Sequence, residues 1–223
     1  MTNPRDPDRT RRSILDAAAA EFCADGLAGA RIDSIAAAAG VNKRMLYHYF
    51  GNKDGLFAAV LAERLGAPSS APASTRLGER LIGAQQRAAQ HPQQTRLLMW
   101  EALAHAGQDI AAASARTVAW REPVAANAAA QRAGRLRGDV DPAQLELALA
   151  ALVLFPFAFP QLTQLIAGTA PNDAAFLAAH SAFLTTVGKL FEAVVEDAAA
   201  EPAKPRYRLA ATVTETATRS GRE

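Results

Sequence analysis

Residues 31–53 read R-I-D-S-I-A-A-A-A-G-V-N-K-R-M-L-Y-H-Y-F-G-N-K, and this stretch decides the fold. Gly40 lies where a helix end favours a residue that tolerates a positive φ. Before it, apolar residues recur at the 3/4 spacing of a helix of about ten residues, and they are Ile32, Ile35, Ala36 and Ala39. The pattern therefore predicts a short helix that ends at Gly40.

A second short helix is predicted from Lys43 to Phe50. Asn42 precedes it and is a good N-cap, because its side-chain oxygen can accept a free N–H of the next turn. Leu46, Tyr49 and Phe50 are expected to face inward. The residues expected to face outward are Lys43, Arg44, Tyr47 and His48. Two short helices joined by a tight turn with glycine describe a helix-turn-helix. The alternative is an ordinary corner of a helical bundle, but such a corner rarely presents Lys-Arg-x-x-Tyr-His as one patch.

Composition narrows the class of protein. Half of the 223 residues are hydrophobic, and the frequent alanine favours helix over strand. The net charge is only +2, so any basic surface for nucleic acid must be local. Cys23 is the single cysteine, which excludes an internal disulfide and is more typical of a packing residue than of a nucleophile.

The sequence contains no clear motif for metal binding or catalysis. The four histidines form no H-x-x-H or H-x-x-x-H pair, and no G-x-S-x-G or phosphate-binding loop occurs. We therefore expect no metal, no cofactor and no enzymatic activity. The first ten residues lack the apolar core of a signal peptide, and prolines and polar residues interrupt the most apolar run, Leu145 to Ile166. The expectation is a cytoplasmic protein with no membrane partner.

Helical patterns extend over most of the chain, and no strand is predicted, so the fold class is all-α. Helices are expected at 9–25, 53–65, 75–91, 93–106, 111–132, 142–167 and 174–195. Asp141 and Pro142 should begin the helix at 142, and Pro156 and Pro160 should bend or break it. We predict a flexible arm at 1–8, a helix-turn-helix domain at 9–66, a second helical domain at 75–198 and a disordered tail at 199–223.

Residues 10–61 resemble the DNA-binding domain of the tetracycline-repressor (TetR) family. The matching elements come in the family's order and spacing: T-R-R-S-I-L-D-A-A at 10–18, Phe22, Gly26, I-A-A-A-A-G-V at 35–41, L-Y-H-Y-F-G-N-K at 46–53 and Leu56. The rest of the chain resembles the family only in its layout of helices. The resemblance implies that the first three helices and the start of the fourth bind DNA. It also implies a C-terminal small-molecule pocket and a homodimer interface formed by the last two helices.

Two departures from the family pattern affect the DNA contacts. The family often has Thr or Ser as the cap of the second helix, whereas this chain has Ala30-Arg31. The recognition helix often begins Ser-x-Gly-Thr, and here the residues are Asn42, Lys43, Arg44 and Met45. The operator sequence therefore cannot be transferred from a relative.

Candidate DNA contacts follow from these positions. Side chains near the start of a recognition helix meet base edges, and arginine can bind guanine with two hydrogen bonds. The resemblance makes Tyr47 a phosphate ligand, and Lys53 begins a helix whose free N–H groups attract phosphate. Met45 could contact a thymine methyl or pack, Tyr49 could pack or bind phosphate, and Arg31 could bind phosphate or remain solvated. The candidates are Arg31, Asn42, Lys43, Arg44, Met45, Tyr47, His48, Tyr49 and Lys53.

A pocket is predicted by residue type alone. Aromatic and soft apolar residues lie near helices that prolines should bend, and bent helices leave cavities. The candidates are Met99, Trp100, Leu103, Trp120, Phe155 and Phe159. The alternative is that each is a core residue. A ligand of such a pocket would be largely hydrophobic.

Together these features predict a homodimeric transcriptional repressor. The helix at 42–50 would bind a palindromic double-stranded DNA operator, and a small hydrophobic effector would release it. One alternative is an activator, or a regulator that responds to no ligand. Another, from a different class, is a helical enzyme or a carrier of lipophilic ligands.

Overall fold

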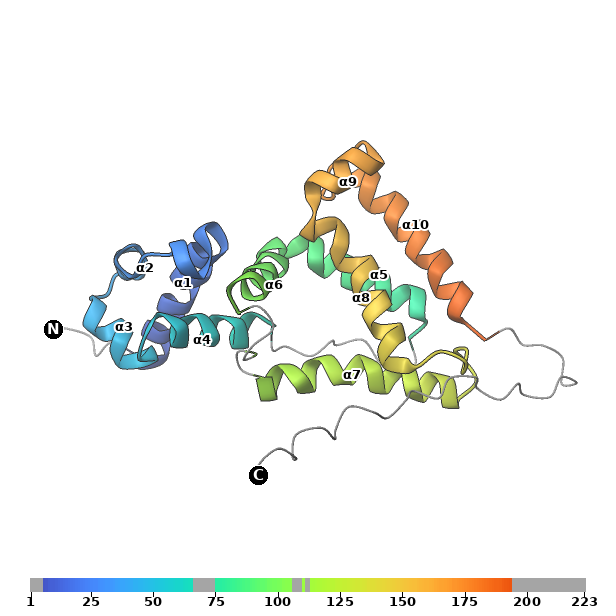
Figure 1. Ribbon diagram of the computed structural model, residues 1–223, viewed down its shortest axis with the longest axis horizontal. Coiled ribbons are helices and arrows are strands. Elements are labelled where there is room, and N and C mark those ends of the chain that lie inside the picture. Colours follow the sequence, from blue (N-terminus) through green and yellow to red (C-terminus); the bar gives the residue numbers. More distant parts are fainter. Residues whose placement is uncertain (1–5, 66–74, 106–109, 111–112, 194–223) are drawn as a thin grey trace, which may run out of the picture. The chain divides into compact units, whose positions relative to one another are not determined.

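The structure is a computed structural model that describes residues 6–65, 75–105, 110 and 113–193. The described residues form helices and one isolated bridge, Leu136–Glu192, but no strand (Figure 1). This confirms the all-α class. The helices are α1 (Pro7–Gly29), α2 (Ile32–Ala39), α3 (Lys43–Phe50), α4 (Lys53–Leu65), α5 (Leu77–Gln90), α6 (Pro92–His105), α7 (Ala113–Arg132), α8 (Pro142–Ala158), α9 (Pro160–Ala167) and α10 (Ala174–Phe191).

The first helix begins earlier than the sequence predicts. The Asp6 side chain accepts a hydrogen bond from the backbone N–H of Asp8 at 3.0 Å, and Pro7 occupies the first helical position. Placing Pro7 and Asp8 in a flexible arm was therefore wrong. Residues 1–5 of that arm, the predicted break at 66–74 and the predicted tail at 199–223 lie outside the described residues.

A kink interrupts α1 close to the predicted helix end. Gly26 has φ 68° and ψ −178°, a backbone conformation that is essentially restricted to glycine. The Trp100 ring lies directly over it, so that a Cβ placed on Gly26 would be 2.6 Å from Trp100 Cε3. The indole Nε1–H donates to the Cys23 carbonyl at 3.3 Å, which fixes the ring on the kink. Trp100 thereby joins α6 to the end of α1.

The first of two hydrophobic cores lies among α1 to α4. Large side chains from each of these helices are fully buried in it, including Phe22 and Phe57, whose rings meet edge to face at 5.0 Å. Leu97 of α6 is also fully buried in this core, and Trp100 packs against it. The helix-turn-helix therefore rests on a core to which α6 contributes.

The second core lies among α5, α7, α8 and α10. The backbones of α5 and α10 approach each other closely at Gly78 and Gly188. A Cβ on Gly188 would lie only 2.5 Å from the nitrogen of Gly78, so only glycine fits there. The buried Gln85 reinforces this contact by donating to the Leu177 carbonyl at 3.0 Å and accepting from Ser181 Oγ at 2.7 Å. The close glycine contact and the polar bridge together fasten α10 to α5.

The prolines of the predicted helix at 142–167 break it as expected. Asp141 caps α8 by accepting from the N–H groups of Ala143 and Gln144, and Pro142 follows at the first position. The chain then bends by 91° between α8 and α9. Thr163 Oγ1 donates to the Pro156 carbonyl at 3.1 Å, which satisfies a buried acceptor at the bend.

One apolar helix, α10, is little covered by the residues that the structure describes. By length and composition α10 could cross a membrane, with a mean hydropathy of 1.3, but only 17% of that window is buried. The α8–α9 pair reaches the same criterion only if the two helices are counted as one span. Core helices of soluble proteins reach it as well.

Candidate nucleic-acid interface and ligand cavity

The turn between α2 and α3 forms as the sequence predicts. Gly40 is left-handed at φ 66°, its N–H donates to the Ala37 carbonyl, and the Val41 N–H donates to the Ala36 carbonyl. These two bonds satisfy the free carbonyls at the end of α2. The Asn42 side chain then accepts from the Met45 N–H at 2.9 Å and caps α3. The predicted Gly40 helix end and Asn42 cap are confirmed.

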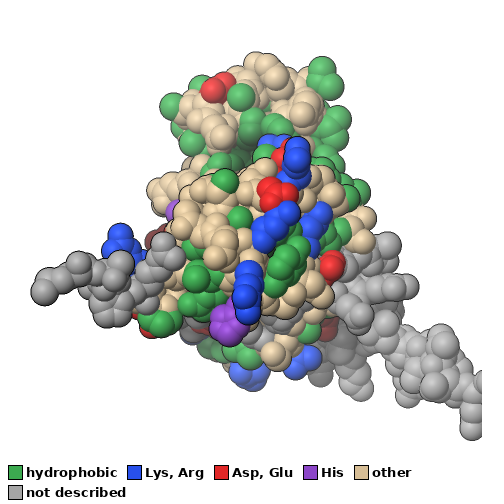
Figure 2. Space-filling model, turned by 90° about the vertical axis from the view of Figure 1, so that its left-hand side faces the viewer, with side chains coloured by type: hydrophobic (Ala, Val, Ile, Leu, Met, Phe, Trp, Pro, Cys, Tyr) green, Lys and Arg blue, Asp and Glu red, His purple; other side chains and the backbone are tan. Residues whose placement is uncertain are grey.

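The outward face of α3 is also the predicted one. Leu46 is buried, whereas Lys43, Arg44, Tyr47 and His48 are exposed. Figure 2 views this end of the molecule and shows Lys and Arg side chains in a row, with a few acidic side chains between them and a His side chain at one end. Basic and aromatic groups are therefore presented together on one helix face.

Lys43 has an ion-pair partner within the protein, whereas Arg44 has none among the described residues. Lys43 Nζ lies 2.6 Å from Asp33 Oδ1 of α2, an ion pair between two exposed side chains. Such surface pairs contribute little stability, so Lys43 can exchange this partner for another anion. The Arg44 side chain makes no ion pair or hydrogen bond with any residue in the described ranges. Its guanidinium is free to bind a ligand.

Tyr49 and Lys53 make contacts within the protein. The Tyr49 hydroxyl donates to the Pro7 carbonyl at 3.4 Å, and its ring lies 6.0 Å from that of Phe50. Lys53 Nζ donates to the carbonyls of Ala28 and Ala30 at 3.1 and 2.9 Å, so the start of α4 is tied to the end of α1. Both side chains have a structural role, and Lys53 retains one donor for another acceptor.

Arg31, Asn42 and Met45 complete the predicted set. Arg31 precedes α2 and makes no side-chain cap, in agreement with the weak cap expected from the sequence. Glu21 compensates by accepting from the Arg31 N–H at 2.9 Å, and the Arg31 side chain is exposed. Asn42 is exposed, and Met45 is half-buried. The structure therefore leaves the Arg31 side chain available at the edge of the motif.

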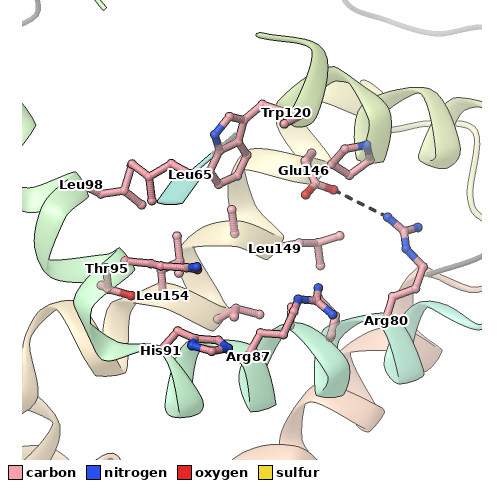
Figure 3. A pocket seen from close by; sticks show the side chains of 18 of the residues that line it. Leu65, Arg80, Arg87, His91, Thr95, Leu98, Trp120, Glu146, Leu149 and Leu154 are labelled. Atoms are coloured by element: carbon pink, nitrogen blue, oxygen red, sulfur yellow. Dashed lines mark ion pairs between the residues drawn. The ribbon is translucent and has the colours of Figure 1, made fainter. Parts of the chain in front are cut away.

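A cavity of about 360 Å³ lies among α5, α6, α7 and α8, and the last turn of α4 also lines it (Figure 3). Its walls are largely apolar, with Trp120 at one side and leucines from several helices opposite. Polar and charged side chains also line it: Arg64, Arg80, Arg87, His91, Gln94, Thr95 and Glu146. The cavity thus has the size and mixed lining of a small-molecule site.

Of the six predicted pocket residues, Trp120 lines this cavity and the other five do not. Trp100 packs on the first core instead, and Leu103 is 72% exposed. Phe155 and Phe159 contact each other at 5.1 Å and are each 44% exposed. The remaining residue, Met99, is half-buried.

The helical repeat of α8 explains why the phenylalanines lie elsewhere. Glu146, Leu149, Ala150, Val153 and Leu154 line the cavity at 3/4 spacing. The exposed Leu147 and Phe155, eight residues apart, lie on a different face of the same helix. Residue type alone could not distinguish the two faces.

A partly buried polar network forms one end of the cavity. Arg80 Nη2 lies 4.0 Å from Glu146 Oε2, and Asn127 accepts from Arg80 Nη1 at 2.8 Å and donates to Glu146 Oε2 at 2.9 Å. Burial lowers the pKa of Arg80, an effect that the charge of Glu146 partly offsets. Burial raises the pKa of Glu146, whereas the Asn127 hydrogen bond and the Arg80 charge lower it. The two charges therefore serve chiefly to neutralise each other.

The charged cavity residues of α5 were missed at the sequence level, although the sequence contains a signal for them. The apolar stripe of α5 consists of Leu77, Leu81, Ala84 and Ala88. Arg80, Arg87 and His91 lie on this same stripe at 3/4 spacing. Arg80 is partly buried, whereas Arg87 and His91 are exposed, and a charged residue that faces the core is rarely buried without a polar partner. Their presence on the stripe therefore predicts a polar site beneath α5.

The all-α fold, the intact turn and the basic outward face of α3 define a DNA-binding protein of the helix-turn-helix class. Residues 14–60 match the family described as "Bacterial regulatory proteins, tetR family", and residues 82–189 match "Tetracyclin repressor-like, C-terminal domain". The chain belongs to the TetR family of transcriptional regulators.

Individual relatives agree with this assignment. The HTH-type transcriptional repressor SCO4008 of Streptomyces coelicolor is 33% identical over 169 residues, which cover 74% of this chain and 86% of that one. The HTH-type transcriptional repressor NicS of Pseudomonas putida is 44% identical over 70 residues, 31% of this chain and 33% of that one. Among solved structures, the putative transcriptional regulator SCO4942 of Streptomyces coelicolor has a TM-score of 0.68 at 25% identity and covers 82% of this chain and 98% of that one. All three carry the names of transcriptional regulators.

Proposed function

We propose that this protein is a homodimeric repressor that binds a palindromic operator through α3 and releases it when a small molecule fills the cavity. The observation that carries the proposal is the outward face of α3, where Lys43, Arg44, Tyr47 and His48 are exposed on a well-capped helix. The repressor names of SCO4008 and NicS support the direction of regulation. In this proposal residues 9–66 are the DNA-binding domain and residues 75–198 bind the effector and the second copy.

In the proposed complex the start of α3 meets base edges in the major groove. Arg44 reads a base with its free guanidinium, and Lys43 leaves Asp33 for a phosphate or a base. Asn42 and Met45 lie beside them at the same end of the helix. The phosphate contacts come from Arg31, Tyr47, His48 and the third donor of Lys53. Tyr49 joins them by exchanging the Pro7 carbonyl for a phosphate oxygen as the acceptor of its hydroxyl.

The proposed dimer forms through α8 and α10. Large apolar side chains are exposed on both helices, among them Leu147, Phe155, Phe183 and Leu190. Several large exposed apolar side chains on neighbouring elements favour an interaction site. A symmetric pair of these surfaces would place two α3 helices on one duplex, which is why the operator should be an inverted repeat.

Two helices connect the cavity to the DNA-binding core in the proposed mechanism. One side of α6 lines the cavity through Thr95 and Leu98, while Leu97 and Trp100 pack into the first core. The last turn of α4 contributes Arg64 to the cavity wall as well. A ligand that prefers one arrangement of these helices therefore changes the placement of α3. It can do so only because it binds the two arrangements with different affinity.

Selection of bound sequences from random DNA tests the proposed DNA binding. We expect enrichment of an inverted repeat, and a binding constant that falls linearly on a log–log plot against salt, because phosphate contacts release counterions. A mutated repeat of the same length serves as the control DNA. Failure to enrich any sequence, or binding that does not change with salt, would contradict the proposal.

Replacing Phe183 by glutamate should convert the dimer into monomers. Burying an unpaired carboxylate costs several kcal/mol, so the dimer dissociation constant should rise by roughly a hundredfold. Sedimentation velocity over a concentration series measures the change. The matched control is Leu103→Glu, which places the same charge on an exposed apolar position of α6. An unchanged dimer in the Phe183 variant would exclude this face as the interface.

A further inference from the structure

The cavity wall carries more positive than negative side chains. Arg64, Arg80 and Arg87 line it together with His91, whereas Glu146 is the one carboxylate among the lining residues in the described part of the chain. The cavity is partly open, and Arg87 and His91 are exposed at its edge, so an anion can reach them from solvent, and the excess of positive charge favours an anion over a cation.

Two of the three arginines already have an acidic partner. Arg64 is paired with Asp16 of α1, and Arg80 contacts Glu146 and Asn127. The Arg87 side chain, by contrast, has no ion pair or hydrogen bond with any residue that the structure describes. Arg87 therefore contributes an uncompensated charge to the cavity.

Arg87 lies in the last turn of α5 and His91 is the residue that directly follows the helix, and both line the cavity. In Figure 3 the guanidinium of Arg87 points from α5 into the cavity, toward Leu149 on the opposite wall. Leu65, Leu98, Leu154 and Trp120 surround the rest of the space (Figure 3). The cavity is consequently amphipathic, with Arg80 and Arg87 along α5 and mostly apolar side chains on the other helices, among which Arg64, Gln94, Thr95 and Glu146 are the polar exceptions.

We propose that the cavity binds a small amphiphilic carboxylate, with the carboxylate on Arg87 beside His91 and the apolar body against the leucines and Trp120. A planar guanidinium matches a carboxylate with two parallel hydrogen bonds. This inference rests on the proposed function, because it gives the chemical class of the effector. It also refines the largely hydrophobic ligand expected from the sequence by adding a negative head group.

A cationic ligand is the competing occupant, and Glu146 would be its natural partner. Glu146, however, already accepts a hydrogen bond from Asn127 and faces Arg80. A cation would also have to enter beside the unpaired Arg87. The arrangement of charges therefore favours the anion.

Matched probes that differ only in the head group test the proposal. We expect 4-butylbenzoate to bind the full chain, in the absence of DNA, roughly tenfold or more tightly than 4-butylbenzamide, and 4-butylbenzylamine to bind more weakly than either. Isothermal titration calorimetry measures the three affinities. Decanoate, decanamide and decylamine repeat the comparison with a different apolar body.

The variant Arg87→Gln tests whether the carboxylate of the ligand binds at Arg87. It should weaken binding of 4-butylbenzoate by roughly tenfold while leaving 4-butylbenzamide nearly unchanged, because only the acid uses the positive charge. The control Arg76→Gln removes the same charge from an exposed position at the start of α5 that does not line the cavity. It should leave all affinities unchanged. Circular dichroism and thermal melts establish that both variants fold.

Three results would overturn the inference: equal affinities for acid and amide, tighter binding of the amine, or no binding of either acid. These measurements are independent of the proposed DNA binding, because no DNA is present. Carboxylate binding that leaves operator affinity unchanged supports the inference and removes ligand release from the proposed function. Loss of operator binding on adding the acid supports both.

Discussion

Replacing Arg44 by alanine is expected to weaken operator binding by about tenfold to a hundredfold. A well-placed arginine pair with a guanine contributes about 1–3 kcal/mol of discrimination. Arg44 is exposed on the outward face of α3, and its guanidinium has no partner within the described part of the chain. No internal contact is lost in the variant, so its free energy of unfolding should remain that of the unsubstituted protein.

Fluorescence anisotropy with the selected operator measures this loss. Variant operators with single base changes should then reveal one position in each half-site where the preference has relaxed. Arg121→Ala is the control, because Arg121 is exposed on α7 and distant in sequence from the motif. Unchanged affinity in Arg44→Ala, with specificity retained at every position, would exclude α3 as the reading helix.

Lys43→Ala provides a useful comparison with Arg44→Ala. Lys43 must first leave Asp33, so part of its interaction with DNA is offset by the lost ion pair. We expect a smaller loss of affinity that is similar for all sequences, together with a shallower dependence on salt.

Replacing Gly26 by alanine is expected to destabilise the fold by about 3 kcal/mol or more. Two costs combine at this position. The φ and ψ values of Gly26 lie in a region essentially closed to other residues, which costs of order 1–3 kcal/mol. The added methyl would also lie 2.6 Å from Trp100, whose ring is held by its hydrogen bond to Cys23.

Chemical denaturation followed by circular dichroism measures the destabilisation. The double variant Gly26→Ala/Trp100→Ala separates the two costs, because removing the ring relieves the steric part and leaves the backbone strain. Gly83→Ala is the control, since Gly83 is helical and a Cβ there meets only the end of Arg87 at 3.5 Å. Alanine favours a helix interior, so this control should be neutral or slightly stabilising. Equal stability of Gly26→Ala and the unsubstituted protein would show that the kink is not required.

The helix-turn-helix could be predicted because its determinants are local. Gly40 ends α2 and Asn42 caps α3 through bonds to residues only a few positions away. The outward face of α3 follows from helical spacing around the buried Leu46. The bend after α8 is equally local, since it depends on Pro160 and its neighbours.

Features that depend on distant residues could not be predicted in the same way. Lys53 binds the carbonyls of Ala28 and Ala30, which lie more than twenty positions earlier. Phe155 suits a pocket by its type, but the packing of α8 directs it to another surface. The charged residues of the cavity become a site only when α5, α7 and α8 come together. Tertiary packing decides each of these cases.

Helix α6 lines the cavity with one side and packs into the first core with another, and this restricts how the protein can acquire a new effector. Thr95 and Leu98 face the cavity, whereas their close neighbours Leu97 and Trp100 belong to the first core. A substitution on α6 that reshapes the cavity therefore also disturbs the support of α3. Substitutions at Trp120 or Leu149 avoid this conflict, because α7 and α8 contribute no buried residue to the first core in the described part of the chain. We expect changes of effector preference to accumulate on α7 and α8, with α6 remaining constant.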